Sequence, residues 1–97
     1  INDNYSAWDD DMMLGSVRYT EYIELCYSLR KIGYDGWTSV DIFPFRENGY
    51  AAAAESIRMM QTFDRAVDLI GYEKLTECIN GTDATKVFGL IREAIFK

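Results

Sequence analysis

The sequence of 97 residues predicts an α/β fold, with elements in the order strand, helix, strand, helix, helix, helix. The helices are predicted because apolar residues recur at helical spacing and the periodic stretches end near glycine. The second strand is predicted because residues 37–43 are rich in aromatic and β-branched side chains and stop before Pro44. The first four elements form a βαβα unit, whose two strands should be parallel with a right-handed crossover.

The first half of the chain gives one strand and one helix. Residues 1–15 are expected to form a short strand followed by an acidic loop. A helix of about 16 residues follows, over 16–32, where Ser16 or Thr20 could supply the N-terminal cap because a side-chain oxygen accepts an otherwise unpaired amide hydrogen. Gly33 is expected to end this helix.

The second half is mostly helical. After the strand at 37–43 and a loop over 44–50, the apolar period resumes and is interrupted by Gly71 and by the pair Asn80-Gly81. Thr82 or Asp83 could cap the last helix. The predicted helices cover residues 51–70, 72–79 and 83–96.

Composition narrows the classes of function. The net charge is −6, and without a basic stripe the chain is a poor candidate for binding nucleic acid. No apolar run is long enough for a membrane span, and no secretory signal is visible, so we expect a cytoplasmic protein without membrane contact. Histidine is absent, which excludes Ser-His and Cys-His dyads. Because no initiator methionine is present, we expect the chain to start within a longer sequence.

Two cysteines, Cys26 and Cys78, occupy apolar positions of predicted helices. Their wide separation favours two buried, reduced thiols over a disulfide or a metal site, although spacing alone leaves those alternatives open. Reduced thiols fit a cytoplasmic location.

The densest chemical signal is the acidic run Asp9-Asp10-Asp11. In an extended segment, Asp9 and Asp11 point the same way and Asp10 points away, so the first and third carboxylates could face one cation. Oxygen ligands of this kind suit Mg²⁺, Mn²⁺ or Co²⁺. The alternative is a solvated acidic loop.

A second signal is Asp41, a carboxylate among apolar neighbours near the end of the second predicted strand. If the ends of both strands share one sheet edge, Asp41 and the pair Asp9 and Asp11 converge on a cation pocket. Arg46, just beyond, could reach a sugar or phosphate or could lie in a solvated loop. Trp8 belongs to a group of aromatic residues that could form either core or a sugar-stacking wall.

Three segments together resemble the xylose-isomerase-like (β/α)8 barrel family, including the rhamnose isomerases. The opening Ile1-Asn2-Asp3-Asn4 with Trp8-Asp9-Asp10-Asp11 is similar to that family's seventh strand and loop. The segment from Leu29 to Gly36 resembles the seventh helix and turn, and Val40-Asp41-Ile42-Phe43-Pro44 with Arg46 resembles the eighth strand and loop. The resemblance covers about residues 1–70.

That resemblance implies a function for the parent protein. It implies that 1–71 are the last two β/α units of a TIM barrel and that 72–97 are a C-terminal helical extension. Asp9 and Asp11 would hold a catalytic divalent cation and Asp41 would hold a structural one. Trp8 and Arg46, singled out from the residues themselves, are the candidates for contact with the sugar or sugar phosphate. The implied reaction is aldose–ketose isomerisation, with an epimerase as the alternative.

The 97 residues alone are expected to be inactive, because the ligands and acids on earlier strands are not in this chain. Two parallel strands do not make a stable sheet, so missing residues or another copy must complete it. We therefore expect a homo-oligomer, and a non-catalytic, self-associating α/β module is a further alternative.

Overall fold

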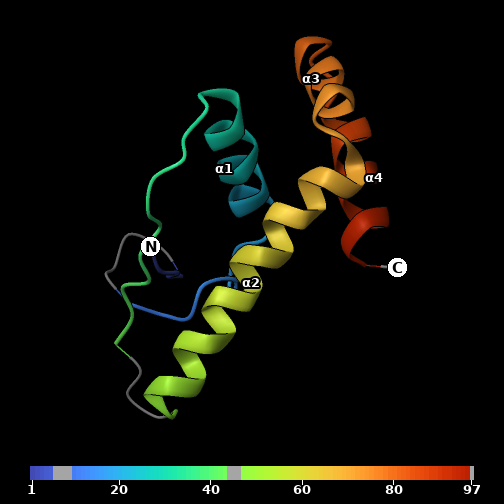
Figure 1. Cartoon of the computed structure of the whole chain (residues 1–97). Helices are drawn as coiled ribbons and strands as arrows, with labels where there is room; N and C mark the ends of the chain where they lie inside the picture. The colour runs from blue at the N-terminus through green and yellow to red at the C-terminus, as the bar shows by residue number, and fades with distance from the viewer. Residues whose placement is uncertain (6–9, 44–46, 97) are drawn as a thin grey trace.

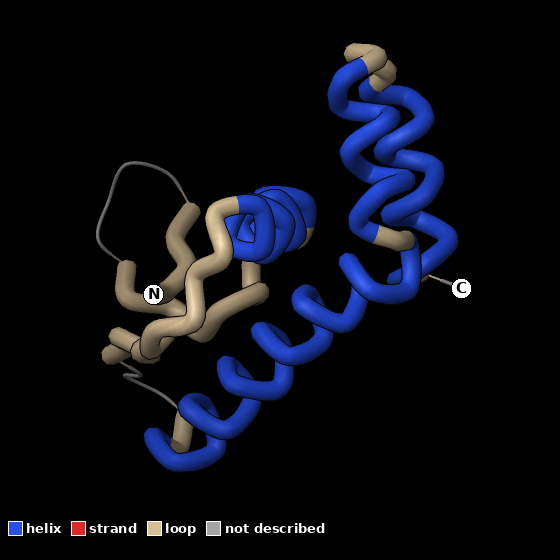
Figure 2. The backbone as a smooth tube through the Cα atoms, turned by 45° about the horizontal axis from the view of Figure 1, so that its top comes forward, coloured by secondary structure: helices blue, strands red, loops and turns tan. Residues whose placement is uncertain are grey.

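A computed structural model describes residues 1–5, 10–43 and 47–96, and within these ranges it contains four α-helices and no β-strand (Figures 1 and 2). The predicted α/β class, with its βαβα segment of a TIM barrel, is therefore wrong. The long helix α2 runs diagonally through the molecule, α1 packs against it, and α3 and α4 form a hairpin at its C-terminal end. The helices span Thr20–Lys31 (α1), Gly49–Ile70 (α2), Tyr72–Asn80 (α3) and Ala84–Ile95 (α4).

Helix α1 begins later than predicted but ends as predicted. Its N-cap is Tyr19, without a side-chain cap, and the hydroxyl of Ser16, one of the two predicted caps, donates to the carbonyl of Met13 at 2.6 Å. At the other end, Gly33 adopts a positive φ of 68°, and its amide donates to the Arg30 carbonyl. The next amide, that of Tyr34, donates to the Leu29 carbonyl, which completes a Schellman motif.

Gly71 separates α2 from α3. Its φ of 101° is strained for any residue with a Cβ, and its amide closes α2 by donating to the Val67 carbonyl at 2.8 Å. The chain therefore turns at Gly71 without an intervening loop, and α3 starts at the next residue. At its other end, α2 is capped by the side chain of Asn48, which accepts the amide of Ala51.

The last helix closes a tight hairpin. Asp83, one of the two residues predicted as the cap, caps α4 by accepting the amide of Lys86. The amide of Asp83 donates to the Cys78 carbonyl, so the turn between the two helices is tied back to α3. Figure 2 shows α3 and α4 side by side.

The core lies where all four helices and the N-terminal segment meet. Phe63 and Val67 of α2 are fully buried, and the ring of Phe63 lies 5.7 Å from the ring of Tyr22 on α1. The N-terminal segment contributes Leu14, whose amide donates to the buried hydroxyl of Ser56. The buried residues of this cluster are Leu14, Ile23, Cys26, Tyr27, Phe63, Ala66, Val67, Leu75 and Ile91.

The two segments predicted as strands lie side by side but do not form a sheet. The terminal amine of Ile1 donates to the Ser39 carbonyl, and the Ile1 carbonyl accepts the amide of Asp41 at 2.9 Å. This is the bonding pattern of one parallel bridge. A single antiparallel bridge links Asp3 to Met12. These bonds form no ladder among the described residues, because each bridge stands alone without a second one beside it.

Candidate functional site

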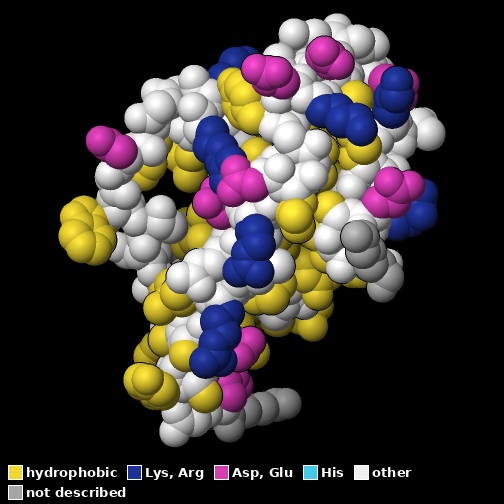
Figure 3. All heavy atoms as spheres, turned by 45° about the vertical axis from the view of Figure 1, so that its right-hand side comes forward, with side chains coloured by type: hydrophobic (Ala, Val, Ile, Leu, Met, Phe, Trp, Pro, Cys, Tyr) yellow, Lys and Arg dark blue, Asp and Glu magenta, His cyan; other side chains and the backbone are white. Residues whose placement is uncertain are grey.

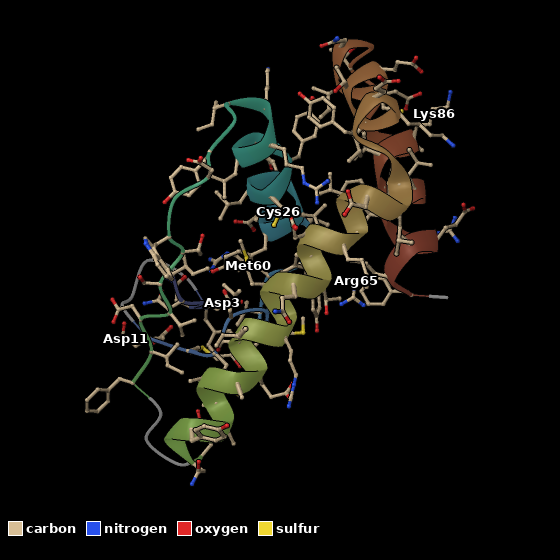
Figure 4. The ribbon with its side chains drawn as sticks, in the orientation of Figure 1. Asp3, Asp11, Cys26, Met60, Arg65 and Lys86 are labelled. Carbon is tan, nitrogen blue, oxygen red and sulfur yellow. The ribbon has the colours of Figure 1, made fainter. Side chains whose placement is uncertain are left out.

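The structure describes only part of the predicted metal and sugar site. Trp8, Asp9 and Arg46 lie outside the described residues. Asp11 is half-buried and its carboxylate accepts the side-chain amide of Asn2 at 2.8 Å. Asp41 is exposed, and its backbone amide binds the Ile1 carbonyl. Figure 4 places Asp11 beside the extended connector that follows α1.

Asp10 and Asp11 line one shallow hollow of about 420 Å³, and Asp41 is not among its lining residues. Asp11 adopts a φ of 48°, outside the extended region that the predicted alternation assumes, and Asp9 lies outside the described residues, so the alternation stays a prediction. Glu47 lines the same hollow. No group of three or more His, Cys, Asp or Glu side chains within the described ranges could hold a metal ion.

A buried ion pair that the sequence did not reveal lies next to this hollow. The carboxylate of Asp3 is fully buried and accepts the amides of Val17 and Arg18, both at 2.9 Å. It also pairs with the Arg18 guanidinium at 3.1 Å, and the same guanidinium binds the carbonyl and side chain of Asn4. Asp3 is therefore occupied in holding the N-terminal segment to the turn before α1, which leaves it unsuited to bind a ligand.

A larger hollow of about 550 Å³ lies between α1 and the hairpin of α3 and α4. Its walls are mainly apolar, and Cys78 and Phe88 contribute to the hairpin side. Both cysteines are buried free thiols, which confirms the prediction for their side chains. Burial, with a smaller contribution from the nearby charge of Asp64, raises the pKa of the Cys26 thiol to about 11, so this thiol stays protonated near neutral pH.

The connector between α1 and α2 is the most exposed apolar segment. Along 32–43, only Val40 and Ile42 are even partly buried. The side chain of Trp37 is 93% exposed and that of Phe43 is 61% exposed. Exposed apolar side chains gathered in one segment mark a candidate interaction surface. Figure 1 shows the connector running along the outside of the molecule, away from α3 and α4.

The backbone of this connector is paired on one side only. The carbonyl of Ser39 and the amide of Asp41 bind Ile1, and the amide of Phe43 donates to the Asp11 carbonyl at 2.9 Å. All three groups belong to odd-numbered residues, as expected for an extended chain whose backbone groups alternate in direction. The backbone amides and carbonyls of the even-numbered residues in this connector therefore point to the opposite side.

Comparisons with known proteins give no family for this chain. No protein-family model matches it, and searches among curated proteins and solved structures return no match. Together with the all-helical arrangement of the described residues, this corrects the resemblance to xylose isomerases. The chain is therefore assigned neither to the TIM barrels nor to the isomerases.

Two features were missed from the sequence. The burial of Asp3 could not be anticipated because its partners, Val17 and Arg18, are not marked by any local pattern. The exposure of Trp37 could have been suspected from the sequence, because Trp37 directly follows the predicted turn Tyr34-Asp35-Gly36 and does not lie inside a periodic element.

None of the helices within the described ranges has the length and apolar character that a membrane span requires.

Proposed function

We propose that this chain is a protein-interaction module that associates with a second copy of itself. The supporting observation is an excess of accessible surface. The folded chain exposes 6941 Å², whereas a compact monomer of 11.2 kDa should expose roughly 5,700 Å². The difference, about 1,200 Å², exceeds the roughly 800 Å² that each partner buries in a standard interface.

The shape of the molecule and the type of its surface agree with this proposal. The radius of gyration is 14.3 Å, compared with about 12.5 Å for a compact domain of this length. Among the described residues, thirteen large hydrophobic side chains are exposed, more than the eleven hydrophobic residues of the buried core. Figure 3 shows hydrophobic side chains spread among charged ones over one face. Association would remove part of this apolar surface from water.

Sedimentation velocity over a range from low to high micromolar protein tests the proposal. We expect the weight-average mass to rise from 11.2 kDa towards twice that value as concentration increases. The association should persist in moderate salt, because burial of apolar surface, unlike surface ion pairing, is not screened by ions. A mass of one chain at every concentration would overturn the proposal.

Binding of Mn²⁺, Mg²⁺ or Co²⁺, binding of a sugar or sugar phosphate, and a cytoplasmic location stay predictions from the sequence. The predicted cation ligands stay Asp9, Asp11 and Asp41, of which Asp9 lies outside the described residues. Calorimetric titration of Mn²⁺ into the chain and into its Asp11→Asn variant tests it, because loss of a ligand should abolish any binding heat.

A further inference from the structure

We infer that two copies of this chain pair through the free edge of residues 37–43, as antiparallel strands related by a two-fold axis at Val40. This inference rests on the proposed self-association and names its surface. It follows from three observations on the connector: its unpaired backbone groups, the exposure of its side chains, and the self-complementarity of its sequence.

The first observation is the set of unpaired backbone groups. Within the described part of the chain, the amides and carbonyls of Thr38, Val40 and Ile42 have no hydrogen-bond partner. They face away from the side on which Ser39 and Asp41 bind Ile1. A row of free N–H and C=O groups on an extended segment is the usual template for adding a strand.

The second observation is that this edge carries little of the usual protection. Natural edge strands are blocked by lysine, proline, bulges or a covering helix. Residues 37–43 contain neither lysine nor proline, and Asp41 is their one charged residue. No described helix covers the connector, whose Trp37 side chain is almost fully in water.

The third observation is that the sequence complements itself in one antiparallel register. With Val40 opposite Val40 of the second copy, Thr38 lies opposite Ile42, and each of these pairs exchanges two backbone hydrogen bonds. On the other face, Trp37 lies opposite Phe43 of the second copy. Aromatic pairs and pairs of β-branched residues are the favourable cross-strand combinations.

The position of Asp41 selects this register over its neighbours. Centred on Val40, the pairing places Asp41 opposite Ser39, which can donate a hydrogen bond to it. Moving the axis by one residue to Asp41 would place the two carboxylates directly opposite each other, and a parallel in-register pair would do the same. The two-fold arrangement is closed, since the same surface is used by both copies and no further copy can add.

Disulfide trapping tests the register. In the predicted pair, the Cα atoms at position 40 lie about 5.5 Å apart, within bridging distance, whereas those at position 39 are diagonal and roughly 8 Å apart. Val40→Cys should therefore form a covalent dimer on mild oxidation, on the order of ten-fold faster than Ser39→Cys. The native thiols, Cys26 and Cys78, are buried and provide little background.

A proline pair gives a second, independent readout. Val40→Pro removes an amide that has no partner inside the chain, so it should weaken dimerisation while circular dichroism shows the helices intact. Ser39→Pro removes the neighbouring amide, which points to the other side, and should weaken dimerisation less.

The outcomes separate the two proposals. Selective trapping at position 40 together with loss of dimer in Val40→Pro supports the edge pairing. Equal trapping at both positions, or no trapping at either, in a chain that sediments as a dimer overturns the edge pairing and leaves the proposed self-association standing. A chain that sediments as a monomer at all concentrations overturns both.

Discussion

The carboxylate of Asp3 holds the N-terminal segment against the turn that precedes α1. It is fully buried and accepts four hydrogen bonds, from the amides of Asn4, Val17 and Arg18 and from the Arg18 guanidinium. A buried carboxylate is tolerated only when its oxygens are paired in this way. The stability of the segment over residues 1–5 therefore depends strongly on one side chain.

We expect Asp3→Asn to lower the free energy of unfolding by about 2–4 kcal/mol. The amide keeps the shape of the side chain but replaces one acceptor with a donor that faces the amides of Val17 and Arg18, and it leaves Glu21 as the remaining charged partner of the partly buried Arg18 guanidinium. Urea denaturation followed by circular dichroism measures the change.

The matched control is Asp35→Asn, at an exposed carboxylate in the turn after α1 that forms no ion pair within the described ranges. It should change stability by less than about 0.5 kcal/mol. Equal effects of the two substitutions would contradict the structural role given to Asp3.

Among the elements, the junction of α2 and α3 depends on the backbone conformation of one glycine. Gly71 has a φ of 101°, and a Cβ there would meet only the Lys74 side chain at 3.8 Å, so the obstacle to a larger residue is strain rather than space. Gly89 differs: it lies inside α4, its φ is not positive, and a Cβ added there would meet nothing within 4 Å. The two glycines therefore serve different purposes.

Alanine substitutions at these glycines should have opposite signs. Gly71→Ala should destabilise the chain by about 1 kcal/mol or more, because alanine disfavours a positive φ. Gly89→Ala should stabilise it by about 0.5–1 kcal/mol, because alanine loses less backbone entropy in a helix. Thermal denaturation of both variants checks this, and destabilisation by both would contradict the assignment.

The helices could be predicted from the sequence because their signals are local. The apolar period, the stop at Gly71 and the cap at Asp83 each lie within a few residues of the feature that they specify. The strand at 37–43 could not be judged in the same way. The β-propensity of its residues reflects a fit to a pleated, half-buried surface, and whether such a surface exists depends on the rest of the molecule.

The arrangement of the acidic run could not be predicted for a related reason. Alternation along Asp9-Asp10-Asp11 assumes extended backbone, whereas Asp11 has a positive φ and lines the same hollow as Asp10. The use of Asp3 as a structural carboxylate depends on residues fourteen and fifteen positions later in the chain. Neither the backbone conformation of Asp11 nor the structural role of Asp3 can be deduced from the spacing of residues in the sequence.

For the whole molecule, the extended shape and the exposed apolar residues indicate that the isolated chain is not at its stability optimum. The main cluster of the core contains nine of the eleven buried hydrophobic residues, Phe63 among them, and a small core gives a small margin of stability. Any partner that binds only the folded chain increases that margin by mass action. Self-association should therefore be visible in thermal unfolding as well as in the sedimenting mass.

We expect the midpoint of thermal unfolding to rise with protein concentration. Above the dimer dissociation constant, each ten-fold increase should add roughly 0.7 kcal/mol per chain, which corresponds to about 3–5 °C for a domain of this size. Differential scanning fluorimetry across the concentrations used for sedimentation measures the slope, and Val40→Pro serves as the control, whose midpoint should change little with concentration. A flat midpoint in a chain that sediments as a dimer would mean that the contact persists in the unfolded state. In that case the dimer would not be held by the folded surface described here.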